Sequence, residues 1–466
     1  MGAAASKKTP IFTIAIIAVN IVVYAVTSFE NLFIQVGNYW VSMGGYIPAL
    51  LAEPPQWYRI FTSMFLHADI FHILFNMYFL YLFGRAVEEA LGGGRFLALY
   101  LASGVAASIF HTAFSFIGGS TAYVTPAIGA SGAISGVLGA YLLLYPGTSL
   151  IMGWWFFPFP FFIRLKAAYY LIFWFAAQVF YGYAQAAGST AVFAHAGGFI
   201  AGMALLPLVV NRERILQLKM VSRINPPYYL VFAPARREGL GRSAKIVVAL
   251  ILASLLAGAA YASTGFADPG AIKSASIQYT CGGIPYVDYL GVQLPDVESA
   301  VQDISLDTTR ILLNRLYASG LLYDVAKADK QITIAGETLE VPVRIQVGGR
   351  ITVVDVNMTV NYFSGAYDGD GFLRHGEGNI ATQAVSVQLA YGPGYRLYQM
   401  INYEPITYEF SMSAQTVELA GITQYSALAS LAASAAAIAV VLKKDRDLTL
   451  VGEETEVYRP YFGTPI

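Results

Sequence analysis

Long runs of apolar residues dominate the chain and decide the solvent in which it can fold. The first run covers residues 11–29 almost without interruption, which is long enough for a helix to cross a bilayer core of about 30 Å. Hydrophobic residues make up 56% of the sequence and charged residues 12%. Soluble proteins carry about 25% charged residues. The sequence therefore predicts an integral membrane protein that crosses the bilayer several times.

Seven further apolar runs are expected to cross the membrane after the first. They lie at about residues 70–87, 96–117, 131–146, 167–184, 190–210, 246–262 and 425–442. Runs of this apolarity are typical of transmembrane helices. We therefore expect residues 1–210 to form an all-α membrane core of six helices, residues 246–264 a seventh helix, and residues 425–442 an eighth.

Residues 265–424, between the seventh and eighth helices, resemble a soluble β-rich domain. Apolar and polar residues alternate in 339–347 and 351–360, which predicts strands, and turn-forming residues occupy 367–371. One amphipathic helix is expected over 307–322. A module of this length can build its own core.

Basic residues orient the helices relative to the membrane. Lys7 and Lys8 precede the first apolar run, residues 211–245 are rich in Lys and Arg, and residues 443–466 begin with two lysines. Eight crossings place all three segments on one side, and short cytoplasmic loops are enriched in Lys and Arg. We expect both termini, the 211–245 linker and the 443–466 tail in the cytoplasm. Residues 265–424 would then lie outside the cell membrane.

Composition argues against several other functions. The net charge of −1 gives no sign of nucleic-acid binding, and Cys281 is the one cysteine, which excludes an intrachain disulfide framework and a multi-cysteine metal site. The sequence Asp368-Gly-Asp370-Gly could suggest a calcium loop but is more typical of an Asx-Gly turn. No metal and no cofactor are expected. Asn357 begins a glycosylation sequon on the predicted outer side.

Four polar side chains lie near the outer ends of three predicted helices. Ser131 opens the fourth helix, and His195 lies about one and a half turns, roughly 8 Å, into the sixth. His72 and Asn76 share one face of the second helix, at i and i+4. Each residue alone could simply hydrogen-bond to a neighbouring helix. Polar groups in lipid are energetically unfavourable, so four of them at one depth predict a functional site.

These four residues have the chemistry of a serine hydrolase. Ser131 can act as a nucleophile if His195 accepts its proton. His72, Asn76 and the backbone N–H of Ser131 can stabilise the oxyanion of a tetrahedral intermediate. No Asp or Glu occurs in the third to sixth helices, so no acidic third member is expected. Two residues keep side-chain bulk away from the serine, which lets a substrate backbone approach: Gly129 and Gly132.

The sequence from residue 57 to residue 202 resembles the rhomboid family of intramembrane serine proteases. The resemblance rests on the order and spacing of motifs in separate predicted helices. These motifs are Arg59 after Tyr58, His72-Ile-Leu-Phe-Asn76, Val87-Glu88, Gly129-Ala-Ser-Gly132, and His195 followed by Gly198 and Gly202. Each pattern is weak alone, and the combination is specific.

The resemblance implies that Ser131 and His195 form a catalytic dyad and that His72 and Asn76 line the oxyanion hole. It implies that Gly198 and Gly202 pack the sixth helix closely against the fourth. The expected substrates are single-pass transmembrane proteins in the lipid bilayer, cleaved near the outer face through an acyl-enzyme intermediate.

One departure from the family pattern concerns the histidine. Ser135 stands where the family often has an aromatic residue that packs against the catalytic imidazole. Another aromatic side chain, such as Phe193 or Tyr123, is then expected to support His195.

Two other function classes compete with a protease. A non-proteolytic binder or scaffold could retain the rhomboid fold. A transporter should show internal repeats and broken helices near the midplane, and the sequence has neither. For residues 265–424, our hypothesis is that they recruit or screen substrates.

Overall fold

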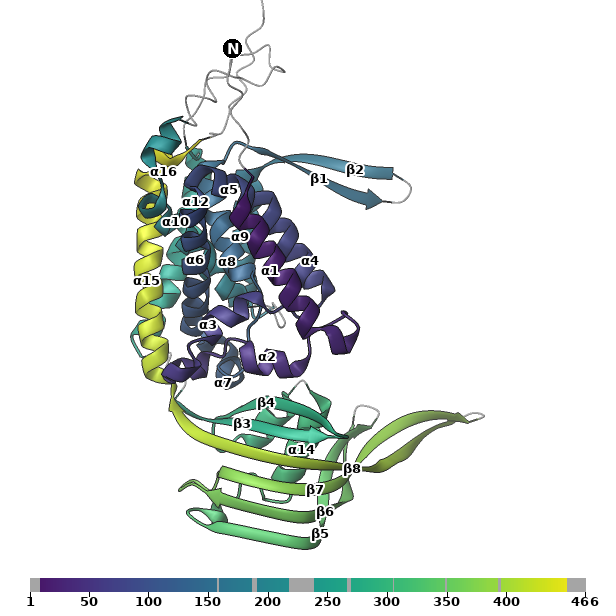
Figure 1. The fold of residues 1–466 in the computed structure, drawn as a ribbon. Coiled ribbons are helices and arrows are strands. Elements are labelled where there is room, and N and C mark those ends of the chain that lie inside the picture. Colours follow the sequence, from purple (N-terminus) through teal and green to yellow (C-terminus); the bar gives the residue numbers. More distant parts are fainter. Residues whose placement is uncertain are drawn as a thin grey trace, which may run out of the picture.

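The computed structural model describes residues 9–156, 159–186, 191–217, 239–265, 270–304, 306–347, 350–392 and 395–450. These residues form a bundle of roughly parallel helices and an antiparallel sheet at one end of the bundle (Figure 1). The membrane core of helices and the β-rich insertion that the sequence predicts are both present. Two predicted segments lie partly outside the described residues, namely 218–238 of the basic linker and 451–466 of the tail.

Each of the eight apolar runs contains a helix within the described residues. These helices are α1 (Ile11–Thr27), α4 (Ile70–Phe79) with α5 (Arg85–Leu91), α6 (Gly93–Phe114), α8 (Ser131–Leu144), α9 (Ala167–Tyr183), α10 (Val192–Val209), α12 (Arg242–Ser263) and α15 (Leu419–Lys443). A π-helical turn at Leu80–Gly84 joins α4 to α5. By length and composition, five helices in the described ranges can cross a membrane, and α1 and α8 are shorter apolar helices. Eight crossings remain a prediction.

Short elements fill connections for which the sequence predicts no regular structure. At the sheet-facing end of the bundle lie α2 (Asn38–Gly44), α3 (Arg59–Thr62) and α7 (Gly119–Ala122), with 3-10 turns at Phe29–Asn31, Pro48–Ala52, Pro54–Gln56, Ser63–Phe65 and Ser115–Gly118. At the opposite end, α16 (Asp445–Leu448) follows α15. There the antiparallel hairpin of β1 (Ser149–Phe156) and β2 (Phe159–Lys166) projects sideways (Figure 1).

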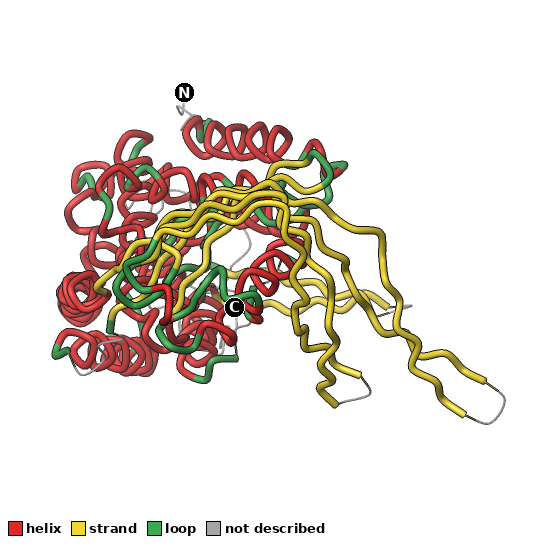
Figure 2. The backbone as a smooth tube through the Cα atoms, turned by 90° about the horizontal axis from the view of Figure 1, so that it is seen from below, coloured by secondary structure: helices red, strands yellow, loops and turns green. Residues whose placement is uncertain are grey.

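The sheet has six antiparallel strands among the described residues, in the order β4-β3-β8-β7-β6-β5. The strands are β3 (Ala271–Cys281), β4 (Ile284–Val292), β5 (Gln331–Val347), β6 (Arg350–Tyr367), β7 (Leu373–Gly392) and β8 (Tyr395–Glu418). Figure 2 shows two long hairpins, β5–β6 and β7–β8, that extend beyond the body of the sheet. Helices α13 (Val297–Gln302) and α14 (Asp307–Ala318) and a 3-10 turn at Val325–Lys327 complete the domain. The helix expected over 307–322 and the strands expected over 339–347 and 351–360 correspond to α14, β5 and β6.

The sheet leaves and rejoins the bundle through neighbouring strands. α12 leads to β3, and β8 runs directly into α15, which begins at the next residue. Ala271, the first residue of β3, pairs with Glu418, the last residue of β8. Helices α12 and α15 also pack against each other in the bundle.

Helix α8 lies at the centre of the bundle. Every one of its residues from Gly132 to Leu144 is buried, as expected for a helix that is apolar on all sides. Its contact with α10 is made by glycines, because a Cβ on Gly198 would overlap the carbonyl oxygen of Gly132, and a Cβ on Gly202 would overlap that of Gly136. Small residues allow two membrane helices to approach this closely.

We expect Gly202→Ala to force α8 and α10 apart. Overpacking of this kind destabilises by about 1–3 kcal/mol. The matched control is Gly94→Ala in α6, where an added Cβ meets nothing within 4 Å. That variant should keep or slightly raise stability, because alanine favours a helix by about 0.5–1 kcal/mol over glycine. Thermal unfolding of both variants in detergent tests the prediction, and equal melting temperatures would contradict it.

Lys273 on β3 holds the turn between β6 and β7. Its Nζ lies 2.7 Å from one carboxylate oxygen each of Asp368 and Asp370, and 2.9 Å from the Thr416 hydroxyl. Asp368 Oδ1 accepts the backbone N–H groups of Asp370 and Phe372, both at 3.0 Å, which is the geometry of an Asx turn. The ammonium group of Lys273 thus forms ion pairs with both aspartates that suggested a calcium loop in the sequence.

This cluster predicts acid sensitivity of the sheet domain. Burial would raise the pKa of Asp368, but the hydrogen bond from Lys273 and the two backbone N–H groups outweigh burial and lower this pKa below its usual value. A carboxyl whose pKa falls on folding stabilises the fold above its unfolded pKa, and that contribution disappears as the pH falls through the folded pKa. We expect the melting temperature of the sheet domain in the full-length protein to fall below about pH 4.

Asp368→Asn should lower that melting temperature at pH 7 and weaken its acid dependence. Hydrogen bonds to charged groups contribute about 1.5–3 kcal/mol. Asp370→Asn is the control, since the Asp370 side chain is 62% exposed and that of Asp368 is 21% exposed. Near-ultraviolet circular dichroism against temperature at several pH values measures the effect. An equal loss of melting temperature in the two variants would contradict the prediction. It would show that the difference in burial between the two carboxylates has no effect on stability.

Candidate active site

Ser131 is the first residue of α8 and lies half-buried at the sheet-facing end of the bundle. The chain enters α8 through Gly129, whose φ of +126° is one that residues with side chains rarely adopt. The Gly129 N–H donates to the Ser63 carbonyl at 2.8 Å. A Cβ on Gly129 would lie 2.8 Å from His72 Nε2. Glycine is therefore required here for both backbone conformation and space.

The side chains of Ser131 and His195 are hydrogen-bonded across α8 and α10. Ser131 Oγ lies 2.8 Å from His195 Nε2. His195 lies in the first turn of α10, one turn before the glycine contact at Gly198 that holds α10 against α8. The depth argument from the sequence placed these two residues at one level, and the structure brings their reactive atoms together.

The other nitrogen of His195 is bound by Gln178 of α9, a residue that the sequence analysis missed. His195 Nδ1 lies 2.8 Å from Gln178 Oε1. An amide oxygen only accepts hydrogen bonds, so this contact requires the proton on Nδ1. Nε2 is then the acceptor that faces the Ser131 hydroxyl. The available signal in the sequence was that Gln178 is a single polar residue within an apolar run. No other motif residue lies at a helical spacing from it that would have indicated its role.

The aromatic neighbour of His195 is Trp174 of α9. The two ring centroids lie 6.1 Å apart at 33°. Phe193, one of the residues expected in this role, instead stacks on Phe114 at 4.4 Å. Tyr123, the other, shares a hydrogen bond of 2.8 Å with Thr423. The aromatic residue next to the His195 imidazole therefore comes from α9 and not from position 135, which is a serine.

His72 and Asn76 face the same region from α4. The Ala68 N–H donates to His72 Nδ1 at 3.3 Å, which leaves the proton of a neutral imidazole on Nε2. That nitrogen is the atom closest to Gly129. Asn76 Nδ2 donates to the His72 carbonyl at 2.9 Å and carries a second N–H. Asp69 caps α4 by accepting the N–H groups of Phe71 and His72, each at 2.9 Å.

His67 is a further neighbour of the site. It is fully buried, and its ring lies edge-on to His72 with centroids 5.1 Å apart. Its Nε2 lies 3.5 Å from the backbone nitrogen of Ala130, the residue before Ser131. His67 thus connects the loop before α4 to the start of α8.

All four polar residues line one cavity of about 1080 Å³. The cavity also contacts Gly129, Gly132 and Trp174. Within the described ranges, no group of three or more His, Cys, Asp or Glu side chains could hold a metal ion. The backbone N–H groups in the first turn of α8 have no partner within the helix and lie at the positive end of its dipole. The cavity can therefore stabilise negative charge next to Ser131.

Two charged residues of the motif lie away from the cavity and hold neighbouring elements. Glu88 is buried and accepts the N–H groups of Phe12 and Thr13 at 3.0 and 2.8 Å, so its carboxylate caps the N-terminus of α1. Arg59 is 2% exposed and donates to the carbonyls of Ser42 and Gly45 at 2.6 and 3.0 Å. Both residues are structural in this arrangement.

Comparison with known proteins places this site in a family. The family model described as "Rhomboid domain" matches residues 54–212. The chain is 42% identical over 102 residues to rhomboid protease GluP of Bacillus subtilis (strain 168), covering 22% of this chain and 18% of that protein. It is 39% identical over 94 residues to putative rhomboid protease YdcA of the same organism, covering 19% and 42%. It is 34% identical over 96 residues to rhomboid protease AarA of Providencia stuartii, covering 19% and 34%.

The matched residues lie in the helical membrane core. They include the hydrogen-bonded Ser131 and His195. The chain contains a rhomboid domain over residues 54–212. It spans less than half the length of each of these three relatives.

Proposed function

We propose that this protein is an intramembrane serine endopeptidase that cleaves single-pass transmembrane proteins near their extracytoplasmic end. The observation that carries the proposal is the 2.8 Å hydrogen bond between Ser131 Oγ and His195 Nε2, inside a cavity that His72 and Asn76 also line. Membership of a family with named proteases supports it.

The proposed orientation puts both termini in the cytoplasm of a cell with the protein in its plasma membrane. The basic residues at positions 7, 8, 443 and 444 support this orientation. The sheet domain would then lie outside the cell, at the same end of the bundle as Ser131. Asn357 is exposed on β6, which keeps its side chain available for the predicted glycosylation.

In the proposed acylation step, Ser131 Oγ attacks the carbonyl carbon of the scissile peptide bond while His195 Nε2 takes the hydroxyl proton. The carbonyl oxygen becomes an oxyanion, which His72 Nε2–H, the free N–H of Asn76 and the Ser131 backbone N–H stabilise. His195 returns the proton to the leaving amine, and the C–N bond breaks to give an acyl-enzyme. Water then attacks the ester with His195 as base, which releases the acid and regenerates Ser131.

Gln178 acts in this mechanism as a positioning residue. Its Oε1 holds the proton on His195 Nδ1 and so presents a basic Nε2 to Ser131. An amide, unlike the carboxylate of a Ser-His-Asp triad, brings no charge to compensate the imidazolium that forms. The bilayer-embedded site thus keeps the tautomer control of a triad without a buried anion, which would be energetically unfavourable there.

The direct test is cleavage of a model single-pass protein in liposomes by purified protein. Ser131→Ala and His195→Ala should each abolish cleavage, and His72→Ala should lower kcat about 10²–10³-fold because it removes an oxyanion donor. His375→Ala is the matched control, since His375 is an exposed residue on β7. Absence of cleavage, together with no labelling of Ser131 by a fluorophosphonate, would instead favour a non-proteolytic membrane-protein binder.

Gln178→Leu removes the acceptor and should lower kcat by about 10–100-fold, within the range that general-base catalysis contributes, with little change in KM. Gln178→Glu keeps an acceptor oxygen and should recover part of that loss. Gln331→Leu is the control, because Gln331 is exposed on β5, the edge strand of the sheet farthest from β4. A rise in KM without a fall in kcat would show that Gln178 binds substrate and does not position His195.

A further inference from the structure

The sheet domain is fixed to the bundle beside the catalytic cavity. Arg59 Nη2 donates to the Tyr289 hydroxyl of β4 at 2.7 Å, while Nη1 donates to carbonyls at the end of α2. The Ser42 hydroxyl donates to the Val287 carbonyl on the same strand, and Gln415 of β8 donates to Glu53. The contact therefore joins strands β4 and β8 to the short elements at the sheet-facing end of the bundle.

An apolar cluster reinforces this contact. Ile47, Leu50 and Val124 of the bundle are buried together with Ile272 and Val417 of the sheet. Gly291 of β4 packs directly on Val124, since a Cβ there would lie 2.6 Å from a Val124 methyl group. Because polar and apolar contacts combine, the edge of the sheet has a defined position over the bundle.

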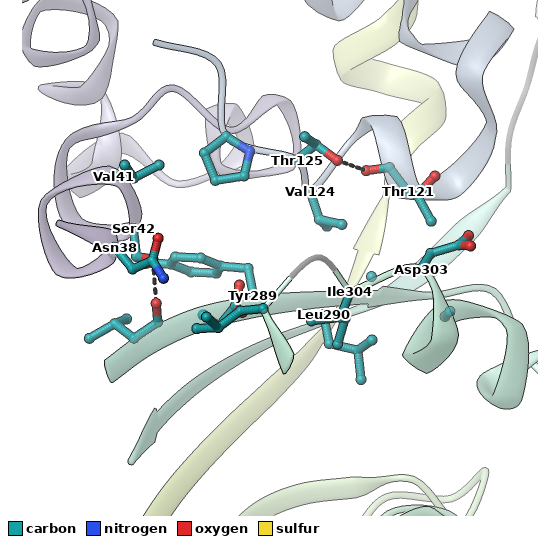
Figure 3. A pocket seen from close by; sticks show the side chains of 16 residues that line it. Asn38, Val41, Ser42, Thr121, Val124, Thr125, Tyr289, Leu290, Asp303 and Ile304 are labelled. Atoms are coloured by element: carbon teal, nitrogen blue, oxygen red, sulfur yellow. Dashed lines mark hydrogen bonds between the residues drawn. The ribbon is translucent and has the colours of Figure 1, made fainter. Parts of the chain in front are cut away.

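A second cavity, which we call the vestibule, lies between these two parts and has a volume of about 270 Å³ (Figure 3). The bundle side is formed by α2, α7 and the loop before α8, and the sheet side by residues of β4 and of the segment around α13. Five residues line both the vestibule and the catalytic cavity: Asn38, Val41, Thr121, Thr125 and Pro126. The two cavities are therefore direct neighbours, and the vestibule lies between the shared residues and strand β4.

We propose that the vestibule binds an extended stretch of the substrate polypeptide, on the extracytoplasmic side of the peptide bond that faces Ser131. This inference rests on the proposed function, which supplies the substrate class. It makes the sheet domain one wall of the substrate path, and so assigns it a role in selecting substrates.

The chemistry of the vestibule suits an unwound polypeptide. A carbonyl must leave its helical hydrogen bond before Ser131 can attack it, so the chain next to it carries free N–H and C=O groups that need partners. The vestibule offers the amide of Asn38, the hydroxyl of Thr121 and the carboxylate of Asp303. Val41, Leu290 and Ile304 supply apolar surface between these groups. A lining of alternating polar and apolar groups matches a backbone with small side chains.

The position of the vestibule also sets a limit on substrates. A chain that leaves Ser131 on this side passes between the bundle and β4 before it reaches free solvent. A folded domain that begins directly after the membrane span would collide with the sheet. We therefore expect cleavage only when the substrate has an unfolded segment between its membrane span and its first folded domain.

Disulfide cross-linking tests the inference without requiring turnover. Asp303→Cys is introduced with Ser131→Ala and with Cys281→Ser, which removes the native thiol. A single-pass substrate carries one cysteine, moved position by position through the residues just outside its membrane span. We expect cross-links from a short window of these positions to residue 303. Glu337→Cys on β5 is the control, since it is exposed at the far edge of the sheet, and it should give none.

A second measurement uses the protein with Ser131 intact. A bulky maleimide on Asp303→Cys should lower substrate cleavage about tenfold, equivalent to about 1.4 kcal/mol. Labelling of Ser131 by a small fluorophosphonate should remain unchanged, because this reagent does not need the vestibule. The same maleimide on Glu337→Cys should change neither rate.

The outcomes separate the two proposals. Cleavage by the Ser131 protein without any cross-link to residue 303 would overturn the vestibule and leave the protease standing. Cross-links without cleavage would support the vestibule as a binding surface and overturn the protease. A disulfide-linked dimer through residue 303 in the absence of substrate would assign the cavity to a second copy of the chain and overturn the inference.

Discussion

The backbone contact between α8 and α10 is the constraint on which the rest of the site depends. Gly198 and Gly202 place α10 directly against the carbonyls of Gly132 and Gly136, and no side chain fits between them. Without this approach, a serine at the start of α8 and a histidine at the start of α10 could not come within 2.8 Å. The close contact of two apolar helices is thus what turns two isolated polar residues into a pair.

A line of hydrogen bonds runs from Gln178 through His195 to Ser131. It shows how a serine–histidine pair can work in the low-dielectric interior of a membrane protein. With the amide oxygen of Gln178 facing Nδ1, the tautomer of His195 that carries its proton on Nδ1 satisfies both hydrogen bonds. The same reasoning applies to His72, whose Nδ1 accepts from Ala68 and whose Nε2–H is therefore directed to the serine side. In the proposed mechanism, two imidazoles with opposite tautomers thus share one cavity, one as base and one as donor.

The sequence predicts the residues of the pair better than their surroundings. Four residues stand out, because they are polar in apolar runs and because their spacings match a family motif. They are Ser131, His195, His72 and Asn76. Gln178 is equally polar in an apolar run, but nothing in the spacing links it to His195 until α9 is packed beside α10. Trp174 is one of several aromatic residues in α9, so composition could not single it out.

Long-range contacts account for the remainder. Alternation identifies β5 and β6 as strands, but it carries no information on strand order or on the place where the sheet meets the bundle. The contact of Arg59 with Tyr289 joins residues 230 positions apart, and a periodic pattern does not encode it. The short elements α2 and α7 are similar, since both pack against β4, which is distant in the sequence.

The connection of the sheet to the bundle has a consequence for the architecture as a whole. Because Ala271 and Glu418 are direct partners, the insertion begins and ends at one place on the membrane surface. The whole domain therefore connects α12 to α15 in the same way as a tight loop between adjacent helices would, whatever the size of the domain. Such a domain can be gained, lost or exchanged with little disturbance to the helices that carry it, since the closure entropy of a loop grows only slowly with its length. The helical core and the sheet domain can in this sense change independently during evolution.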